Sequence, residues 1–156
     1  MIGSFGLIDK DTPESAYTIQ SNEGTTWELQ FSDEFETEGR SFWPGDDPYW
    51  EAGDFHAWAT NDLEWYSPKQ FKTVGGNLEI TLSKESYKGL DYVGGALNTW
   101  NKFCFTGGRL EVSLQLPGRA DVFGLWPAVV SQTVARASLS VFDADGLSLP
   151  PSVDDG

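Results

Sequence analysis

The sequence predicts an all-β protein built as an antiparallel β-sandwich or barrel, and three observations support this prediction. Several short stretches alternate apolar and polar residues, which is the period of a half-buried strand. Turn residues separate these stretches, since the 156 residues include 17 Gly and 8 Pro. Aromatic residues make up 14% of the chain, a composition that suits strands. The length allows one domain at most.

The first quarter of the chain is expected to be mostly irregular. Residues 1–26 carry Gly, Ser, Pro and Thr without apolar periodicity, which indicates an extended lead-in. A strand is predicted over 27–31, where apolar and polar residues alternate. Residues 41–58 are too irregular for a helix and too aromatic for a flexible linker, so we expect a packed surface loop. Most of its three tryptophans are expected to hold that loop together, and all three are weaker candidates for stacking on a sugar ring: Trp43, Trp50 and Trp58.

The clearest hairpin joins residues 71–74 to residues 77–83. Gly75 and Gly76 lie between these two runs and give a two-residue turn signal. Two later strands are predicted over 109–116 and 122–126. The first of them is expected to turn four apolar side chains inward: Leu110, Val112, Leu114 and Leu116.

The composition and residue pattern of the sequence change after Val129. A short helix is possible just beyond it, and the acidic stretch 143–156 is expected to be disordered. The predicted organisation is therefore a lead-in over 1–26, one β domain over 27–129 and a divergent tail over 130–156.

Charge and composition exclude several classes of partner. Ten Lys and Arg against 24 Asp and Glu give a formal charge of -14, which disfavours nucleic acid and anionic membrane surfaces. No apolar run approaches the roughly 20 residues of a membrane span, and the first ten residues lack the features of a signal peptide. No cofactor or metal is expected, because the grouping of Asp46, Asp47 and Glu51 lacks EF-hand spacing and contains a proline.

Five ordered blocks of uncommon aromatic sequence carry a resemblance to a known family. They lie at residues 29–35, 43–51, 62–66, 100–108 and 124–128. In this order they resemble the fungal β-glucan synthesis-associated proteins, which are membrane-anchored relatives of glycoside hydrolase family sixteen. The likeness runs from about residue 7 to residue 129.

The resemblance implies a fold, a ligand and a location. It implies a jelly roll of the concanavalin A-like type, which would be incomplete here, with a concave face that forms a cleft for β-glucan. Relatives act in the synthesis of fungal cell-wall β-1,6-glucan, in the membranes of the secretory pathway or at the cell surface. The matching region would lie on the luminal or extracellular side.

The resemblance also implies that the catalytic residues are missing from this sequence. Retaining glycosidases need two carboxyl groups about 5–5.5 Å apart, which the family places in a Glu-x-Asp-x-Glu or Glu-x-Asp-x-x-Glu strand downstream of the block at 124–128. No such motif follows Trp126, so no catalytic residue is assigned. Glu34, Glu36 and Glu38 alternate, but they are more simply a solvated edge. His56 has no nucleophile motif nearby, which leaves it a loop histidine.

Four residues are predicted to contact a glucan: Asn61, Trp126, Glu64 and Trp100. The resemblance puts Asn61 and Trp126 along the cleft, where an amide can bond hydroxyl groups and an indole can stack on a sugar ring. A place in the core is an equally open alternative for Trp126. Cys104 is the lone cysteine, and it is either a buried apolar side chain or half of a disulfide whose partner is absent.

Three hypotheses of function remain at this point. The chain is a glycosidase-like or transglycosylase-like enzyme of β-glucan assembly, a non-catalytic glucan-binding fragment, or a truncated product that does not function. The absence of a Glu-x-Asp motif favours the last two for this sequence.

Overall fold

The chain is an all-β protein, as its sequence predicts. A computed structural model describes residues 6–119, 121, 124–134 and 136–142. The regular structure of these residues consists of short strands and two 3-10 helices, η1 (Glu14–Ala16) and η2 (Pro68–Gln70). The strands are β1 (Thr18–Gln20), β2 (Thr26–Glu28), β3 (Glu51–Ala52), β4 (Glu64–Tyr66), β5 (Phe71–Val74), β6 (Asn77–Ile80), β7 (Tyr92–Gly94), β8 (Ala96–Asn98), β9 (Ala128–Val134) and β10 (Arg136–Phe142).

The chain divides into two compact units. The first combines Met1–Ser41 with Lys72–Glu79, and the second combines Phe42–Phe71 with Ile80–Gly156. Within the residues described, no helix is long and apolar enough to cross a membrane.

In the first unit, β1 and β2 form an antiparallel hairpin. Ile19 pairs with Trp27 at its centre. The predicted lead-in therefore contains a strand, and the predicted strand over 27–31 is shifted, because β2 begins at Thr26 and ends at Glu28. Pairing with β1, rather than the alternation alone, sets these limits.

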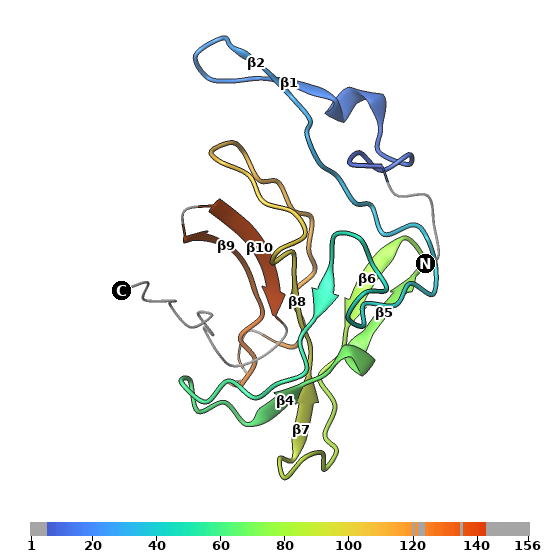
Figure 1. Cartoon of the computed structure of the whole chain (residues 1–156), viewed down its shortest axis with the longest axis vertical. Coiled ribbons are helices and arrows are strands. Elements are labelled where there is room, and N and C mark those ends of the chain that lie inside the picture. The colour runs from blue at the N-terminus through green and yellow to red at the C-terminus, as the bar shows by residue number, and fades with distance from the viewer. Residues whose placement is uncertain (1–5, 120, 122–123, 135, 143–156) are drawn as a thin grey trace. The chain divides into compact units, whose positions relative to one another are not determined.

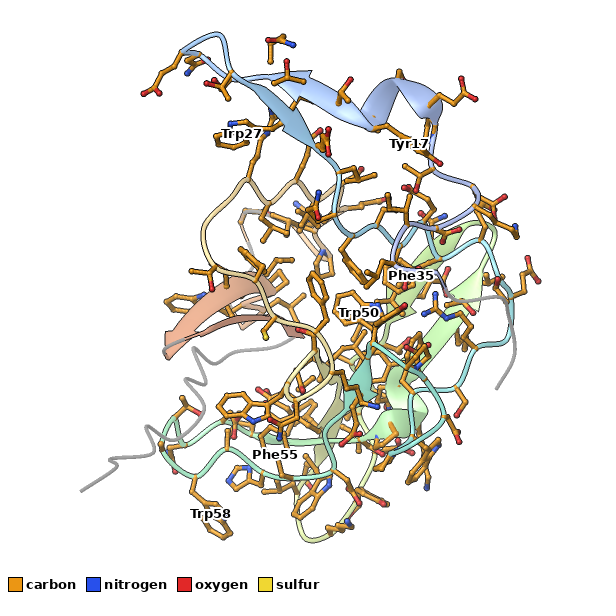
Figure 2. All side chains as sticks on the ribbon, turned by 45° about the horizontal axis from the view of Figure 1, so that its top comes forward. Tyr17, Trp27, Phe35, Trp50, Phe55 and Trp58 are labelled. Carbon is orange, nitrogen blue, oxygen red and sulfur yellow. The ribbon has the colours of Figure 1, made fainter. Side chains whose placement is uncertain are left out.

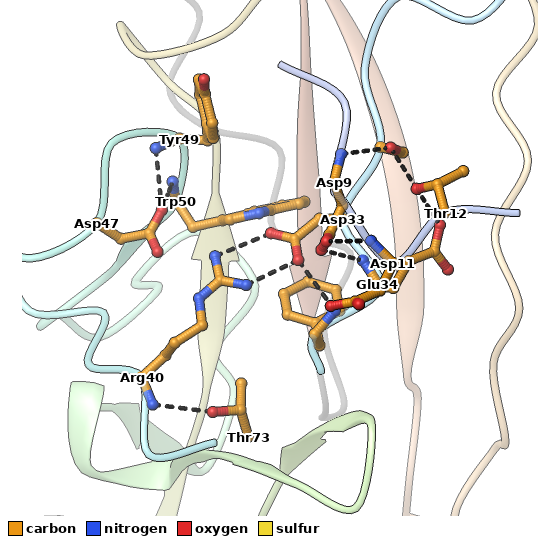
Figure 3. A network of polar contacts seen from close by, with 12 residues as sticks. Asp9, Asp11, Thr12, Asp33, Glu34, Arg40, Asp47, Tyr49, Trp50 and Thr73 are labelled. Carbon is orange, nitrogen blue, oxygen red and sulfur yellow. Dashed lines mark hydrogen bonds and ion pairs between the residues drawn. The ribbon is translucent and has the colours of Figure 1, made fainter. Parts of the chain in front are cut away.

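Arg40 makes a buried ion pair within one segment of the first unit and a hydrogen bond to the other segment. The Arg40 guanidinium donates to both carboxylate oxygens of Asp33, over 2.7 Å and 2.9 Å (Figure 3). The Arg40 backbone N–H donates to the Thr73 hydroxyl at 2.9 Å. This bidentate geometry satisfies a charge that would be costly to bury alone.

Two of the three alternating glutamates, Glu34 and Glu38, accept hydrogen bonds from other residues of the first unit. Glu34 accepts a hydrogen bond from the Thr12 hydroxyl at 2.8 Å. Glu38 accepts one from the Gly75 backbone N–H at 3.1 Å. Glu34 is also half-buried, so the predicted solvated edge is only partly exposed.

The predicted hairpin at residues 71–83 is confirmed. β5 and β6 form a two-stranded sheet, and both turn residues have positive φ, 58° at Gly75 and 71° at Gly76. Two consecutive left-handed residues define the type I′ turn, whose twist matches that of the flanking strands. β6 ends at Ile80, which is earlier than the sequence suggests.

In the second unit, four strands form a sheet in the order β3-β8-β10-β9, and every neighbouring pair is antiparallel (Figure 1). Leu97 of β8 is fully buried, and Val130 of β9 packs against the cluster of Tyr66 and Ala96. Residues just beyond Val129 are thus strand, and the suggested helix is wrong, because β9 and β10 pair along their whole length. The predicted disorder of 143–156 lies outside the described residues.

One strand pair departs from the antiparallel pattern. β4 and β7 run parallel, with Glu64 opposite Tyr92 and Tyr66 opposite Gly94. The long connection between these strands allows this direction, since parallel neighbours cannot be joined by a tight turn. The predicted antiparallel arrangement is therefore confirmed for the four-stranded sheet, and the β4–β7 pair departs from it.

The aromatic loop at 41–58 is packed in part. Trp50 is buried, and the Asp47 carboxylate fixes the preceding turn by accepting the backbone N–H groups of Tyr49 and Trp50, each at 2.9 Å (Figure 3). Trp58, by contrast, is 84% exposed, so it is not among the tryptophans that pack this loop.

Residues 109–116 form no strand, contrary to the prediction. Their four apolar side chains are exposed by 41–60%. The segment alternates correctly, but none of the described residues pairs with it as a strand. Residues 124–126 also lie outside any strand, and 122–123 fall outside the described residues. Cys104 is exposed and free, which excludes the buried alternative.

Candidate functional site

Three polar side chains form the centre of the candidate site, Asp62 just before β4 and Glu64 and Tyr66 on it. Burial alternates along residues 62–66 as it does along a strand, so these three side chains share one face. All three are buried, and Glu64 and Tyr66 are 2% and 0% exposed. Two carboxyl groups and a phenol on one buried face are unusual, since such groups need specific partners away from water.

His56 ties the preceding loop to this row. Its Nδ1 lies 3.0 Å from the Asp62 Oδ1 and 3.0 Å from the Glu64 backbone oxygen. Both partners are acceptors, so Nδ1 carries a proton in this arrangement. The first residue of the loop 56–62 is thereby held close to the last residue of the loop and to the start of β4.

Burial also changes the proton affinities of the row. It raises the pKa of the Asp62 carboxyl above its usual value, and the Tyr66 hydroxyl and the His56 charge offset only part of the rise. It raises the pKa of the Tyr66 hydroxyl as well, with further contributions from the charges of Glu64 and Asp62. Tyr66 is therefore a neutral phenol throughout the physiological range.

The opposite face of β4 is occupied by a second cluster. The Trp65 indole N–H donates to Asp54 at 2.6 Å, and the Lys88 ammonium lies 4.2 Å from the centre of the Trp65 ring. Lys88 also pairs with Asp54 at 3.0 Å. The indole hydrogen bond, followed by Lys88, lowers the pKa of Asp54. A cation thus covers a ring face of Trp65.

Two of the four predicted glucan-binding residues lie on this one segment. Asn61 is exposed at the turn before β4, with a left-handed φ of 54° that asparagine tolerates better than most residues. Glu64 is covered, so its carboxylate faces the interior of the unit rather than solvent.

The other two predicted residues come from different segments. Trp100 follows β8 and is 37% exposed, and its backbone N–H donates to the Asn98 side chain at 3.0 Å. Trp126 precedes β9 and is 58% exposed, which is too open for the alternative that it is a core residue. The four residues come from three segments, and only Asn61 and Glu64 share one.

The sequence did not reveal two features of the site. The pairing of His56 with Asp62 spans a loop, and the only sequence signal for it was the polar alternation of 62, 64 and 66. The exposure of Trp58 had no signal, because exposed and buried tryptophans look alike in sequence. The loop before the buried acidic row thus carries an exposed indole at Trp58 and an exposed amide at Asn61.

The sequence matches a known family of proteins over most of its length. Residues 2–139 match the family of the beta-glucan synthesis-associated proteins SKN1/KRE6/Sbg1. The match continues beyond the boundary expected at residue 129. The chain is 52% identical over 123 residues to the beta-glucan synthesis-associated protein KRE6 of Saccharomyces cerevisiae, covering 79% of this chain and 17% of that protein. It is 46% identical over 125 residues to KRE6 of Candida albicans, covering 80% and 17%.

The fold resembles a solved glucanase. The laminarinase from Rhodothermus marinus superposes with a TM-score of 0.56 at 33% identity, covering 66% of this chain and 40% of that one. The likeness agrees with the predicted jelly roll of glycoside hydrolase family sixteen. The chain spans about a sixth of the length of the yeast relatives and less than half of the laminarinase.

Proposed function

Because the chain belongs to the SKN1/KRE6/Sbg1 family of beta-glucan synthesis-associated proteins, we propose that it binds β-glucan and serves fungal cell-wall β-1,6-glucan synthesis. The observation that carries the proposal is the combination of family membership with an exposed amide and indoles in one unit. A neutral polysaccharide also suits a chain of net charge -14, which would repel anionic ligands.

The proposed contacts follow the chemistry of each side chain. Asn61 would exchange hydrogen bonds with sugar hydroxyls, because its amide offers both donors and an acceptor. Trp100 and Trp126 would stack on pyranose rings through their exposed faces. Glu64 is the fourth proposed glucan-binding residue. Because it is buried, it would support the contacting residues rather than touch the sugar itself.

We propose binding, rather than hydrolysis or transfer, as the activity of this sequence. The family's Glu-x-Asp-x-Glu motif is not among its 156 residues. Asp62 and Glu64 do not replace that motif, because both are buried and glycosidase chemistry needs both carboxyl groups at the sugar. The proposed domain is residues 27–129, and its proposed location is the luminal or extracellular side of the secretory pathway or cell surface.

Titration of the purified chain with soluble β-1,3- and β-1,6-glucans tests the proposal. Intrinsic tryptophan fluorescence and release of reducing ends are followed together, with an α-linked dextran as the control ligand. We expect a saturable fluorescence change with a β-glucan and no product. Product release would overturn the non-catalytic assignment. Equal responses to dextran, or none to either β-glucan, would overturn β-glucan binding itself.

A further inference from the structure

We propose that Trp58 is an additional sugar-stacking residue, whose indole face receives one pyranose ring of a β-glucan. The inference rests on the proposed function and extends it to a residue outside the predicted set. Figure 2 shows the Trp58 side chain projecting away from the ribbon of its loop. Its exposed fraction, 84%, is far above that of any other tryptophan whose exposure the structure gives.

Two other tryptophans of the second unit are less available than Trp58. Trp50 is buried, and a face of Trp65 is covered by the Lys88 ammonium at 4.2 Å. Trp58 has a T-shaped contact with His56, with ring centres 4.9 Å apart and planes at 75°. A contact of this geometry, together with the high exposure, leaves an indole face open for a ligand.

A short network holds the Trp58 backbone in place. The Trp58 N–H donates to the His56 carbonyl at 3.1 Å, and the Thr60 backbone and hydroxyl both donate to the Ala57 carbonyl, at 3.3 Å and 3.0 Å. The His56 ring is in turn fixed to Asp62 and to the Glu64 carbonyl. An exposed aromatic on an ordered turn loses little conformational entropy when a ligand binds.

The chemistry of the loop fits a neutral sugar. An indole face attracts the apolar face of a pyranose, and the exposed Asn61 lies three positions along the same loop with an amide that can bond hydroxyl groups. One exposed loop therefore carries both kinds of group that sugar recognition uses.

The binding titration with the Trp58→Ala variant tests the inference. We expect the dissociation constant for the preferred β-glucan to rise about threefold to tenfold, the range for one aromatic contact. Trp58→Phe keeps a smaller ring and should lose less. Trp27→Ala, which removes an exposed tryptophan of the first unit, is the matched control and should leave the affinity unchanged.

Three outcomes separate the inference from the function beneath it. Unchanged affinity in Trp58→Ala, with normal binding by the native chain, would overturn the role of Trp58 and leave the proposed function standing. No binding by the native chain would overturn both. Chemical oxidation by N-bromosuccinimide on the native chain needs no variant: glucan should protect Trp58 from modification, and unchanged reactivity at saturating glucan would also overturn the role.

Discussion

Two segments of the second unit alternate with the same period, and only one of them has a buried face. Residues 62–66 turn the polar side chains of Asp62, Glu64 and Tyr66 inward and leave Leu63 60% exposed. Residues 109–116 have a regular apolar row, and all four apolar side chains are exposed. Alternation therefore tells which residues share a face, and it does not tell which face is covered.

The difference lies in pairing partners. β4 pairs with β7, Tyr66 joins the cluster with Ala96, and the His56 Nδ1 lies 3.0 Å from the Asp62 carboxylate. No strand of the described part of the chain pairs with 109–116, although its pattern fits a sheet better. Burial thus depends on contacts from distant segments, which a local pattern cannot supply.

The largest expected effect comes from removing the centre of the buried row. Tyr66→Ala should lower the free energy of unfolding by about 3–5 kcal/mol, because removal of the buried aromatic ring leaves a cavity beside two buried carboxyl groups. Urea unfolding followed by circular dichroism measures the change. Leu63→Ala, on the opposite face of the same segment, is the control and should cost under about 0.5 kcal/mol. Equal losses in the two variants would contradict the assignment of faces.

A smaller effect is expected from the charge on Asp62. Burial raises the pKa of Asp62, so the folded state holds a proton that the unfolded state releases above the ordinary aspartate pKa of 3.8. The native chain therefore loses stability as the pH rises from 3.8 through the folded pKa, and Asp62→Asn removes this loss.

Stability measured across that pH window compares the two chains. The free energy of unfolding of D62N minus that of the native chain should increase with pH, by about 1.4 kcal/mol for each unit of pKa difference at most. A decrease with pH would mean that His56 stabilises the carboxylate more than burial penalises it.

The smallest effect on stability is expected in the exposed apolar row. The double variant Val112→Thr and Leu114→Thr should change the free energy of unfolding by under about 0.5 kcal/mol, because neither side chain is covered. Aggregation at high concentration should fall, since an exposed apolar row invites association. Light scattering and urea unfolding measure the two quantities. A loss near that of Leu97→Ala, about 2–5 kcal/mol for a buried leucine, would show that the row is covered in solution.

The sequence predicts the local features of this fold well and its long-range features poorly. The Gly75-Gly76 hairpin follows from backbone preferences of two adjacent residues. The strands β9 and β10 were missed, because their formation depends on pairing with each other and with β8. In the site, the choice of Asn61 followed family resemblance, and its contact with glucan remains a prediction.

The parallel pairing of β4 with β7 has a consequence for the order of folding. The β5–β6 hairpin needs only a two-residue turn, and such hairpins form within roughly 1–10 μs. The β4–β7 pair must first close the whole connection over residues 67–91, which costs chain entropy before any hydrogen bond is gained. The hairpin lies inside that connection and shortens the free chain once formed. The polar row of β4 should therefore acquire its partners late, so a nascent chain exposes Asp62 and Glu64 to water until β7 has docked.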